Sequence, residues 1–190
     1  MGGLSSKLTK LKPNREQTEH ILKYLFECEY DQKECNLFEL AQVYNLSQEK
    51  VTAFLESLVS SGLVEARNEN PILTQAGKEY AAQVVRAHRL YETFLARSTS
   101  LPAAKWHQQA HRKEHQLTAE EINKLALNLG NPHFDPHGDP IPNAVGEIKK
   151  KIGINLFECH EGDIVEVIHL EDEPEDIFQE LLQRGFALGM

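Results

Sequence analysis

Residues 37–66, with the sequence LFELAQVYNLSQEKVTAFLESLVSSGLVEA, constrain the fold more than any other part of the chain. A short apolar helix from Phe38 to Tyr44 is followed, after a brief turn, by Ser47, a favoured helix N-cap residue. The next helix carries apolar residues at helical spacing and ends at Gly62. These apolar residues are Val51, Phe54, Leu55 and Leu58. Two helices joined by so tight a turn predict a helix-turn-helix.

The flanking segments extend this motif to a winged helix. Pro13 precedes a predicted helix with an apolar face. That face is made of Ile21, Leu22, Leu25 and Phe26. After the motif, residues 62–74 read as two short strands around a polar tip, which is typical of a wing. Residues 1–86 are therefore predicted to form a winged helix-turn-helix domain with a basic arm at its start. The basic residues of the arm are Lys7, Lys10, Lys12 and Arg15.

The rest of the chain is predicted to be mainly α-helical. Helices are expected over residues 74–96 and 103–115. Thr118 and Glu121 have the spacing of a capping box, so a further helix begins there and stops at Gly130. Near the C-terminus the alternating stretch DIVEVIHL predicts a strand, followed by a short helix.

Composition excludes several classes of protein. The chain has 190 residues, 41% of them hydrophobic and 26% charged, and a formal net charge of -9 with His neutral. That charge argues against general affinity for nucleic acid. No apolar run approaches the ~20 residues that span a bilayer, and the start lacks a signal-peptide core, so we expect a cytoplasmic protein. Cys28, Cys35 and Cys159 form no CxxC pair and are expected to be reduced.

The stretch WHQQAHRKEHQL holds three histidines at a four-residue interval, His107, His111 and His115, next to Glu114. On a helix these side chains share one face. Four ligands on one straight helix cannot surround a single ion, so other elements must complete more than one site. His88 and Glu92, spaced i and i+4 on the preceding helix, are suitable partners, and His20 is a third contributor.

Three interpretations compete for this cluster. A solvated or salt-bridged face is plausible for any single histidine, but it does not account for the whole set. His111 to His115 also matches the H-x-x-E-H pattern of inverted zinc proteases, but that pattern leaves His88, Glu92 and His107 unexplained. A metal-sensing site uses all of these residues together with the winged helix, and we therefore do not expect an enzyme.

Several motifs between Arg15 and Pro142 occur in the order found in one family. They are the helix-turn-helix, LTQAGKEYA, HRLYE, HQQAHRKEH and HGDPIP. The chain resembles the metal-dependent transcriptional repressors of the diphtheria-toxin-repressor (DtxR/MntR) family. The resemblance implies a homodimer with the winged helix at residues 1–86 and a helical metal-binding and dimerisation domain at 87–152. Residues 153–190 resemble the start of an SH3-like (FeoA-like) third domain that is cut short.

The resemblance also implies two sets of metal ligands. The primary site would contain His20, His111, Glu114 and His115. The ancillary site would contain His88, Glu92 and His107, and the third domain can add carboxylates, for which Glu173, Glu175 and Asp176 are candidates. His133 and His137 are left unassigned and are predicted to be structural or solvent-exposed.

Three departures from the family pattern bear on the choice of metal. The position of His20 is usually Met or Asp, that of His111 is usually Cys or Glu, and Lys23 replaces the Glu of manganese-selective members. A binuclear manganese site of that kind is therefore not expected. Imidazole and carboxylate donors suit Fe(II), Mn(II) or Zn(II), and the family favours iron or manganese. Because binding requires neutral imidazole, metal sensing should weaken at mildly acid pH.

The implied function is metal-dependent repression at a palindromic DNA operator. Metal would tie the first helix to the dimer core and fix the spacing of the two recognition helices. The predicted DNA contacts are Ser47, Gln48, Lys50, Arg67, Lys12 and Arg15. Glu49 and Glu56 make the recognition helix a poor surface for phosphate. The alternative is a metal-sensing module that does not bind DNA and acts on a metal transporter by protein contact.

Overall fold

The computed structural model describes residues 12–67, 70–150 and 152–190. The chain divides between Ala82 and Gln83 into two compact units, here called unit 1 and unit 2. Lys7 and Lys10 of the predicted arm lie outside the described residues. Within the described ranges, no helix is both long enough and apolar enough to cross a membrane.

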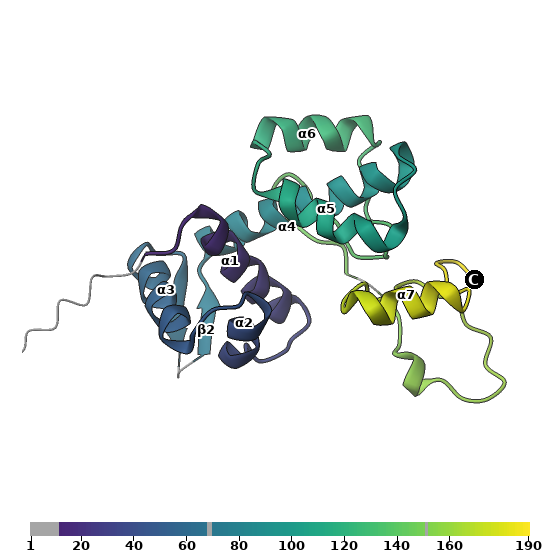
Figure 1. Cartoon of the computed structure of the whole chain (residues 1–190), viewed down its shortest axis with the longest axis horizontal. Coiled ribbons are helices and arrows are strands. Elements are labelled where there is room, and N and C mark those ends of the chain that lie inside the picture. Colours follow the sequence, from purple (N-terminus) through teal and green to yellow (C-terminus); the bar gives the residue numbers. More distant parts are fainter. Residues whose placement is uncertain (1–11, 68–69, 151) are drawn as a thin grey trace, which may run out of the picture. The chain divides into compact units, whose positions relative to one another are not determined.

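Unit 1 has the predicted winged-helix architecture (Figure 1). Its three helices are α1 (Arg15–Tyr30), α2 (Leu37–Val43) and α3 (Gln48–Ser60). The wing consists of the antiparallel strands β1 (Val64–Arg67) and β2 (Asn70–Leu73), with Val64 opposite Leu73. The core of the unit contains the residues predicted from helical spacing. Among them are Ile21, Leu22, Leu25, Val51, Phe54, Leu55 and Leu58, each at most 9% exposed.

Local signals set the ends of these helices. Asn14 and Gln17 form a capping box at the start of α1. The Ser47 hydroxyl accepts a hydrogen bond from the Lys50 backbone N–H at 3.4 Å and caps α3, as predicted. Gly62 follows α3 with φ +74°, a conformation that glycine adopts without a steric cost.

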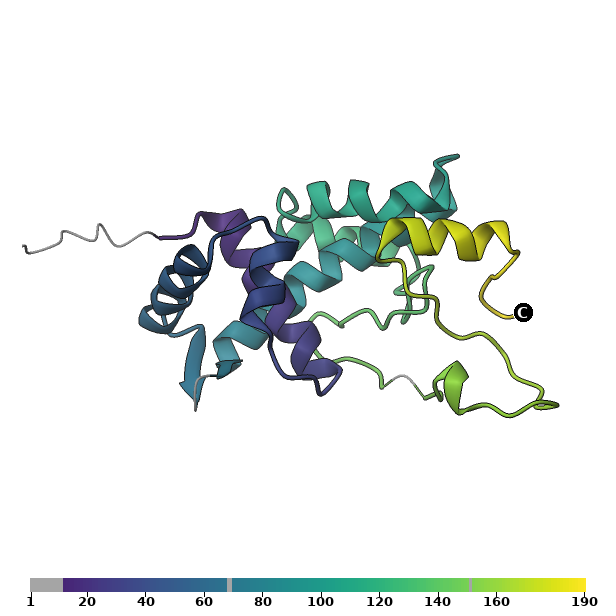
Figure 2. The same ribbon diagram turned by 60° about the horizontal axis from the view of Figure 1, so that its bottom comes forward.

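Unit 2 contains most of the long helix α4 (Gln75–Ser98), then α5 (Trp106–Glu114), α6 (Ala119–Asn128) and α7 (Glu175–Gln183). A short 3-10 turn, η1 (Ala103–Lys105), leads into α5, and another, η2 (Leu156–Glu158), lies in the C-terminal segment. Figure 2 shows α6 running beside α4 in this unit. Their shared apolar core consists of Ala87, Leu90, Ile122, Ala126 and Ile141.

The predicted strand at residues 163–170 is wrong: this stretch is extended but belongs to no sheet. Its backbone groups form hydrogen bonds with separate segments, because no described strand lies alongside it. Val167 exchanges two hydrogen bonds with the C-terminal residues, and the Leu170 N–H donates to the His137 carbonyl at 3.0 Å. A strand needs a continuous neighbour, and most of the apolar side chains of this stretch are exposed, with Ile164 at 101%.

The loop at residues 132–142 packs closely against this extended stretch. Gly138 has φ +90°, and a Cβ atom placed on it would lie 2.1 Å from the Ile168 carbonyl oxygen. Two backbone N–H groups of the loop, those of His137 and Asp139, donate to the Asp135 carboxylate at 2.9 Å each. The loop is therefore a tight turn against which residues 168–170 pack within unit 2.

In unit 1, Glu29 at the end of α1 connects three elements. Its Oε1 atom accepts the Leu73 backbone N–H at 2.7 Å, and its Oε2 atom lies 2.7 Å from the Lys78 Nζ atom on α4. We expect Glu29→Ala to lower the free energy of unfolding by about 1–3 kcal/mol, because a charged acceptor is removed from a partly buried amide. Urea denaturation measures this change.

Glu34→Ala is the matched control for this variant, because Glu34 is an exposed glutamate of the same unit. Its change in unfolding free energy should stay within about 0.5 kcal/mol of zero. Equal losses in the two variants would show that Glu29 does not anchor the wing.

Candidate metal centre

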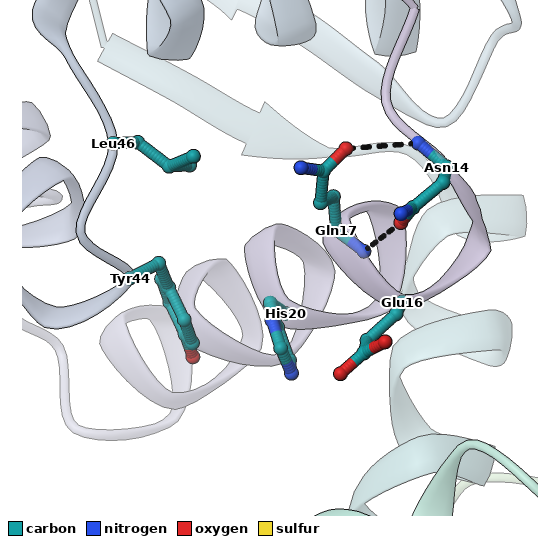
Figure 3. Close-up of a pocket in the computed structure, with 6 residues that line it drawn as sticks. All are labelled: Asn14, Glu16, Gln17, His20, Tyr44 and Leu46. Carbon is teal, nitrogen blue, oxygen red and sulfur yellow. Dashed lines mark hydrogen bonds between the residues drawn. The ribbon is translucent and has the colours of Figure 1, made fainter.

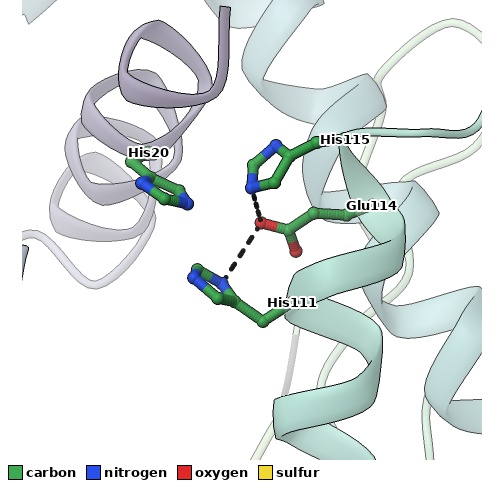
Figure 4. Close-up of side chains that lie close together, drawn as sticks. All are labelled: His20, His111, Glu114 and His115. Carbon is green, nitrogen blue, oxygen red and sulfur yellow. Dashed lines mark ion pairs between the residues drawn. The ribbon is translucent and has the colours of Figure 1, made fainter.

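The C-terminal end of α5 carries three donor side chains, His111, Glu114 and His115, here called the Glu114 group. The Glu114 Oε1 atom lies 3.4 Å from His111 Nδ1 and 3.3 Å from His115 Nε2 (Figure 4). Glu114 is 2% exposed, whereas His111 is half-buried. The helix therefore presents one buried carboxylate between two imidazoles, a donor set that suits a divalent transition metal.

His20, the fourth predicted primary ligand, belongs to unit 1 and lies on α1. Its ring stacks on Tyr44, with ring centroids 4.6 Å apart. The two side chains line a pocket of about 260 Å³ together with Glu16, Gln17 and Leu46 (Figure 3). His20 is half-buried in unit 1, and its ring lies at this pocket rather than in the apolar core.

The three predicted ancillary ligands lie together in unit 2. His88 and Glu92 are 4% and 1% exposed on α4, and His107 lies on α5. One donor atom from each residue lies within 4.8 Å of the others. The His88 Nε2 atom is 3.1 Å and the His107 Nδ1 atom 3.6 Å from the Glu92 Oε1 atom.

A second set of donors meets the other oxygen of Glu92. His137 Nδ1 lies 3.6 Å from Glu92 Oε2 and 3.5 Å from Asp172 Oδ2, and these three residues also fit around one ion. His137 is 3% exposed, and its Nε2 atom has no hydrogen-bond partner among the described residues. We call His88, Glu92, His107, His137 and Asp172 together the Glu92 group.

The structure changes the interpretation of one of the two unassigned histidines. His133 is exposed as predicted, but His137 is buried among donor atoms and stands next to Asp172, which the sequence did not single out. Of the predicted third-domain carboxylates, Glu173 contacts His107 Nε2 at 2.9 Å, and Glu175 pairs instead with Lys105 at 2.5 Å. Asp176 is exposed in the first turn of α7.

Carboxylates control the protonation of the Glu92 group. Burial disfavours the charged form of His107, but hydrogen bonds to Asp172 and Glu173 outweigh it and raise its pKa to about 10. Burial is likewise outweighed at His137, where Glu92 raises the pKa to about 9. Burial alone would raise the pKa of Glu92, yet His88 and His137 hold it below its usual range. Positive charge is thus stabilised at this position, as a bound cation requires.

These shifts predict how the stability of the metal-free protein depends on pH. His107 has a pKa of about 10 in the folded protein and about 6.5 in the unfolded chain. Its pairing with Asp172 therefore makes its full contribution to the stability of the fold below about pH 6.5. That contribution is lost as the pH rises towards 10. We expect His107→Gln to flatten the pH dependence of Tm over this window, and thermal melts in the presence of a chelator measure it.

His133→Gln is the control for this experiment, since His133 is an exposed histidine of the same unit. Its Tm profile between pH 6.5 and 10 should follow that of the unmodified chain. If His107→Gln also leaves the profile unchanged, the pairing of His107 with the C-terminal segment does not contribute to stability.

The residues predicted to contact DNA lie in unit 1. Gln48 and Lys50 are exposed in the first turn of α3, and Ser47 is exposed but already uses its hydroxyl as the N-cap. The same helix also exposes Glu49 and Glu56. Lys12 is exposed, Arg67 ends β1, and the Arg15 guanidinium contacts the buried Glu19 carboxylate at 2.6 Å.

Unit 1 is thus a winged helix, and unit 2 holds two groups of imidazole and carboxylate side chains that could hold metal ions. Comparison with known proteins agrees with both features. Residues 74–143 match the model of the iron dependent repressor metal-binding and dimerisation domain. A solved manganese-dependent transcriptional repressor in complex with manganese superposes with a TM-score of 0.83 and is 28% identical, covering 90% of this chain and 80% of that one. The chain belongs to the diphtheria-toxin-repressor family of metal-dependent repressors.

Two curated relatives show how far the similarity reaches. The iron-dependent repressor IdeR of Mycobacterium tuberculosis (strain ATCC 25618 / H37Rv) is 29% identical over 129 residues, which are 67% of this chain and 56% of the relative. A probable metal transport system membrane protein of Chlamydia trachomatis is 38% identical over 85 residues, or 45% of this chain and 19% of that protein. The chain therefore spans only about half of the first of these relatives and less of the second.

Proposed function

We propose that this protein is a metal-dependent transcriptional regulator that binds a palindromic DNA operator as a homodimer when Fe(II) or Mn(II) is bound. The observation that carries this proposal is the Glu92 group, in which three imidazoles and two carboxylates, among them the buried Glu92, converge within unit 2. The group lies largely within the residues that match a metal-binding and dimerisation domain. Its donors contain no sulfur, so the set also accepts Zn(II).

The primary site consists of the Glu114 group completed by His20 in this proposal. His20 lies on α1 beside the helix-turn-helix, whereas the other ligands lie at the end of α5. An ion held by both helices favours the conformation in which α1 is tied to unit 2. Metal can raise the population of this DNA-binding conformation only to the extent that it binds that conformation more tightly than the one in which His20 is not a ligand.

The ancillary site consists of the Glu92 group. His88, Glu92 and His107 are the ligands expected from the family, and the contacts of His137 and Asp172 with the same carboxylate support adding them. A bound divalent ion supplies positive charge at this point. The chain's own carboxylates orient the imidazoles, and Asp172 brings the C-terminal segment to the site.

The proposal assigns one role to each part of the chain. Residues 1–86 bind DNA, residues 87–152 bind metal and dimerise, and residues 153–190 belong to an SH3-like domain. Gln48 and Lys50 at the exposed start of α3 are the groove-facing residues, and Lys12, Arg15 and Arg67 contact phosphates. Ser47 reaches the same groove in this assignment.

The exposed acidic residues of α3 limit how DNA can be bound. Glu49 and Glu56 lie on the same helix as the single basic groove residue, Lys50. These carboxylates offset part of the attraction between the basic residues and the phosphates, so general affinity for DNA depends on the three phosphate contacts assigned to each subunit. Specificity would depend more on base contacts in two half-sites than on general attraction to DNA.

We expect His111→Ala and Glu114→Gln to abolish metal-dependent operator binding, because each removes a ligand of the primary site. Fluorescence anisotropy of labelled operator DNA, with and without Mn(II), measures the loss, which should be at least about 10-fold in affinity. His133→Ala removes an exposed histidine of the same unit and should bind like the unmodified chain. An unchanged metal response in both ligand variants would contradict the site assignment.

The operator is found by incubating the protein with genomic DNA fragments and sequencing those retained with Fe(II), Mn(II) or Zn(II). Enrichment of one palindrome only when metal is present supports the regulator. If calorimetry shows metal binding but no fragment is enriched, the result favours a metal-sensing module that acts by contact with a protein partner. The similarity to a membrane transport protein covers 85 residues and does not by itself support contact with a transporter.

A further inference from the structure

His20 is the predicted primary ligand that lies in unit 1, and an aromatic ring holds it there. Its imidazole stacks on the Tyr44 ring, with the ring centroids 4.6 Å apart and the ring planes 11° apart. Both side chains are half-buried, and Figure 3 shows the two rings side by side at the pocket that they line. Aromatic rings at this spacing attract each other. The stack therefore favours one rotamer of His20 over the others.

Tyr44 is itself held by the backbone of the helix-turn-helix. It is the C-cap residue of α2, and its backbone N–H donates to the Leu40 carbonyl at 3.2 Å. Two residues later, the Leu46 N–H donates to the Ala41 carbonyl at 2.8 Å. The Tyr44 side chain also packs against the apolar core of unit 1. The surface on which His20 rests is thus fixed by the turn between α2 and α3.

The geometry of the stack leaves coordination by His20 possible. Both nitrogens of an imidazole lie at the edge of the ring, and either can bind a metal ion in the ring plane. Tyr44 covers one face of the imidazole, so it occupies neither of these positions. The stack and a metal–nitrogen bond can therefore exist together. A ligand already held in one rotamer also loses less conformational freedom on binding than one that turns freely.

The stack should be stronger when the imidazole binds an ion. An imidazole bound to a divalent ion carries part of the positive charge, and the face of a tyrosine ring attracts positive charge. A neutral imidazole without an ion gains less from the same contact. Tyr44 therefore interacts differently with the free and the metal-bound states of His20, and such a difference is what changes a binding affinity.

We propose that Tyr44 is a positioning residue for His20, and that its ring raises the affinity of the primary site for its metal ion. This inference rests on the proposed function only in taking His20 as a ligand. Tyr44 contacts the imidazole and not the ion. The helix-turn-helix thereby takes part in metal binding through the ring at the end of α2, in addition to α1, which carries the ligand.

A purely structural role for Tyr44 makes a different prediction. In that case the ring only fills space between α1 and the turn, and any loss of metal affinity follows from a general loss of stability in unit 1. Phe26→Leu is the matched control, because Phe26 is a half-buried aromatic residue of α1 whose side chain packs against the core. The two roles differ in whether Tyr44→Leu and Phe26→Leu have the same effect on metal binding.

The test uses the full chain and Mn(II), with free Mn(II) measured by electron paramagnetic resonance. All variants carry Glu92→Gln, which removes a ligand of the Glu92 group so that the primary site is titrated. Tyr44→Leu should weaken Mn(II) binding by about 3- to 10-fold. Tyr44→Phe keeps the ring and should stay within about twofold of the Glu92→Gln chain, as should Phe26→Leu.

A second measurement detects the stack without metal. In chelator-treated protein, the ring current of Tyr44 should move the Cε1–H and Cδ2–H proton resonances of His20 upfield in the NMR spectrum. This shift should persist in Tyr44→Phe and disappear in Tyr44→Leu. His20→Ala assigns the resonances, because they are missing from its spectrum. Thermal melts in the presence of the chelator establish that each variant is folded.

Three results would overturn the inference. They are an unchanged Mn(II) affinity in Tyr44→Leu, equal losses in Tyr44→Leu and Phe26→Leu, and a loss in Tyr44→Phe as large as that in Tyr44→Leu. Each leaves the proposed function standing as long as His20→Ala weakens Mn(II) binding. If His20→Ala leaves the affinity unchanged, His20 is not a ligand, and the assignment of the primary site fails together with the inference.

Discussion

The buried carboxylate of Glu92 is the interaction on which unit 2 depends. A carboxylate that is 1% exposed is stable only if positive charge and hydrogen-bond donors surround it. The structure provides these from three separate segments, with His88 on α4, His107 on α5 and His137 in the loop before the C-terminal segment. Packing of α4, α5 and this loop is thus tied to a single negative charge.

The sequence was sufficient to predict the features that depend on local spacing. Helical periodicity identified the core of unit 1, and the N-cap at Ser47 followed from side-chain chemistry. The pairing of His88 with Glu92 also follows from local spacing, because i and i+4 residues share a helix face. His137 and Asp172 were missed because they reach the site through a loop and an extended segment, whose positions depend on long-range packing. The short interval between Asp135 and Gly138 in HFDPHGDP was the one available signal of a tight turn there.

The strand predicted at residues 163–170 fails for a related reason. Alternating apolar residues describe a side-chain pattern, but a strand also requires a neighbouring backbone to complete its hydrogen bonds. In the described part of the chain, this stretch bonds to the His137 carbonyl and to the C-terminal residues instead. Most of its apolar side chains, such as Ile164, are therefore exposed, while the nearby Asp172 is fixed by polar contacts with His107 and His137.

Gly138 has no side chain, yet its small size determines how close Asp172 lies to His107 and His137. Any larger side chain at this position would meet the Ile168 carbonyl and push the following residues outward. Because Asp172 lies only four residues beyond Ile168, such a displacement would carry its carboxylate away from His107 and His137. A substitution at this residue, which has no side chain, would thus change the carboxylate–imidazole contacts of the Glu92 group while each of the side chains that make them is retained.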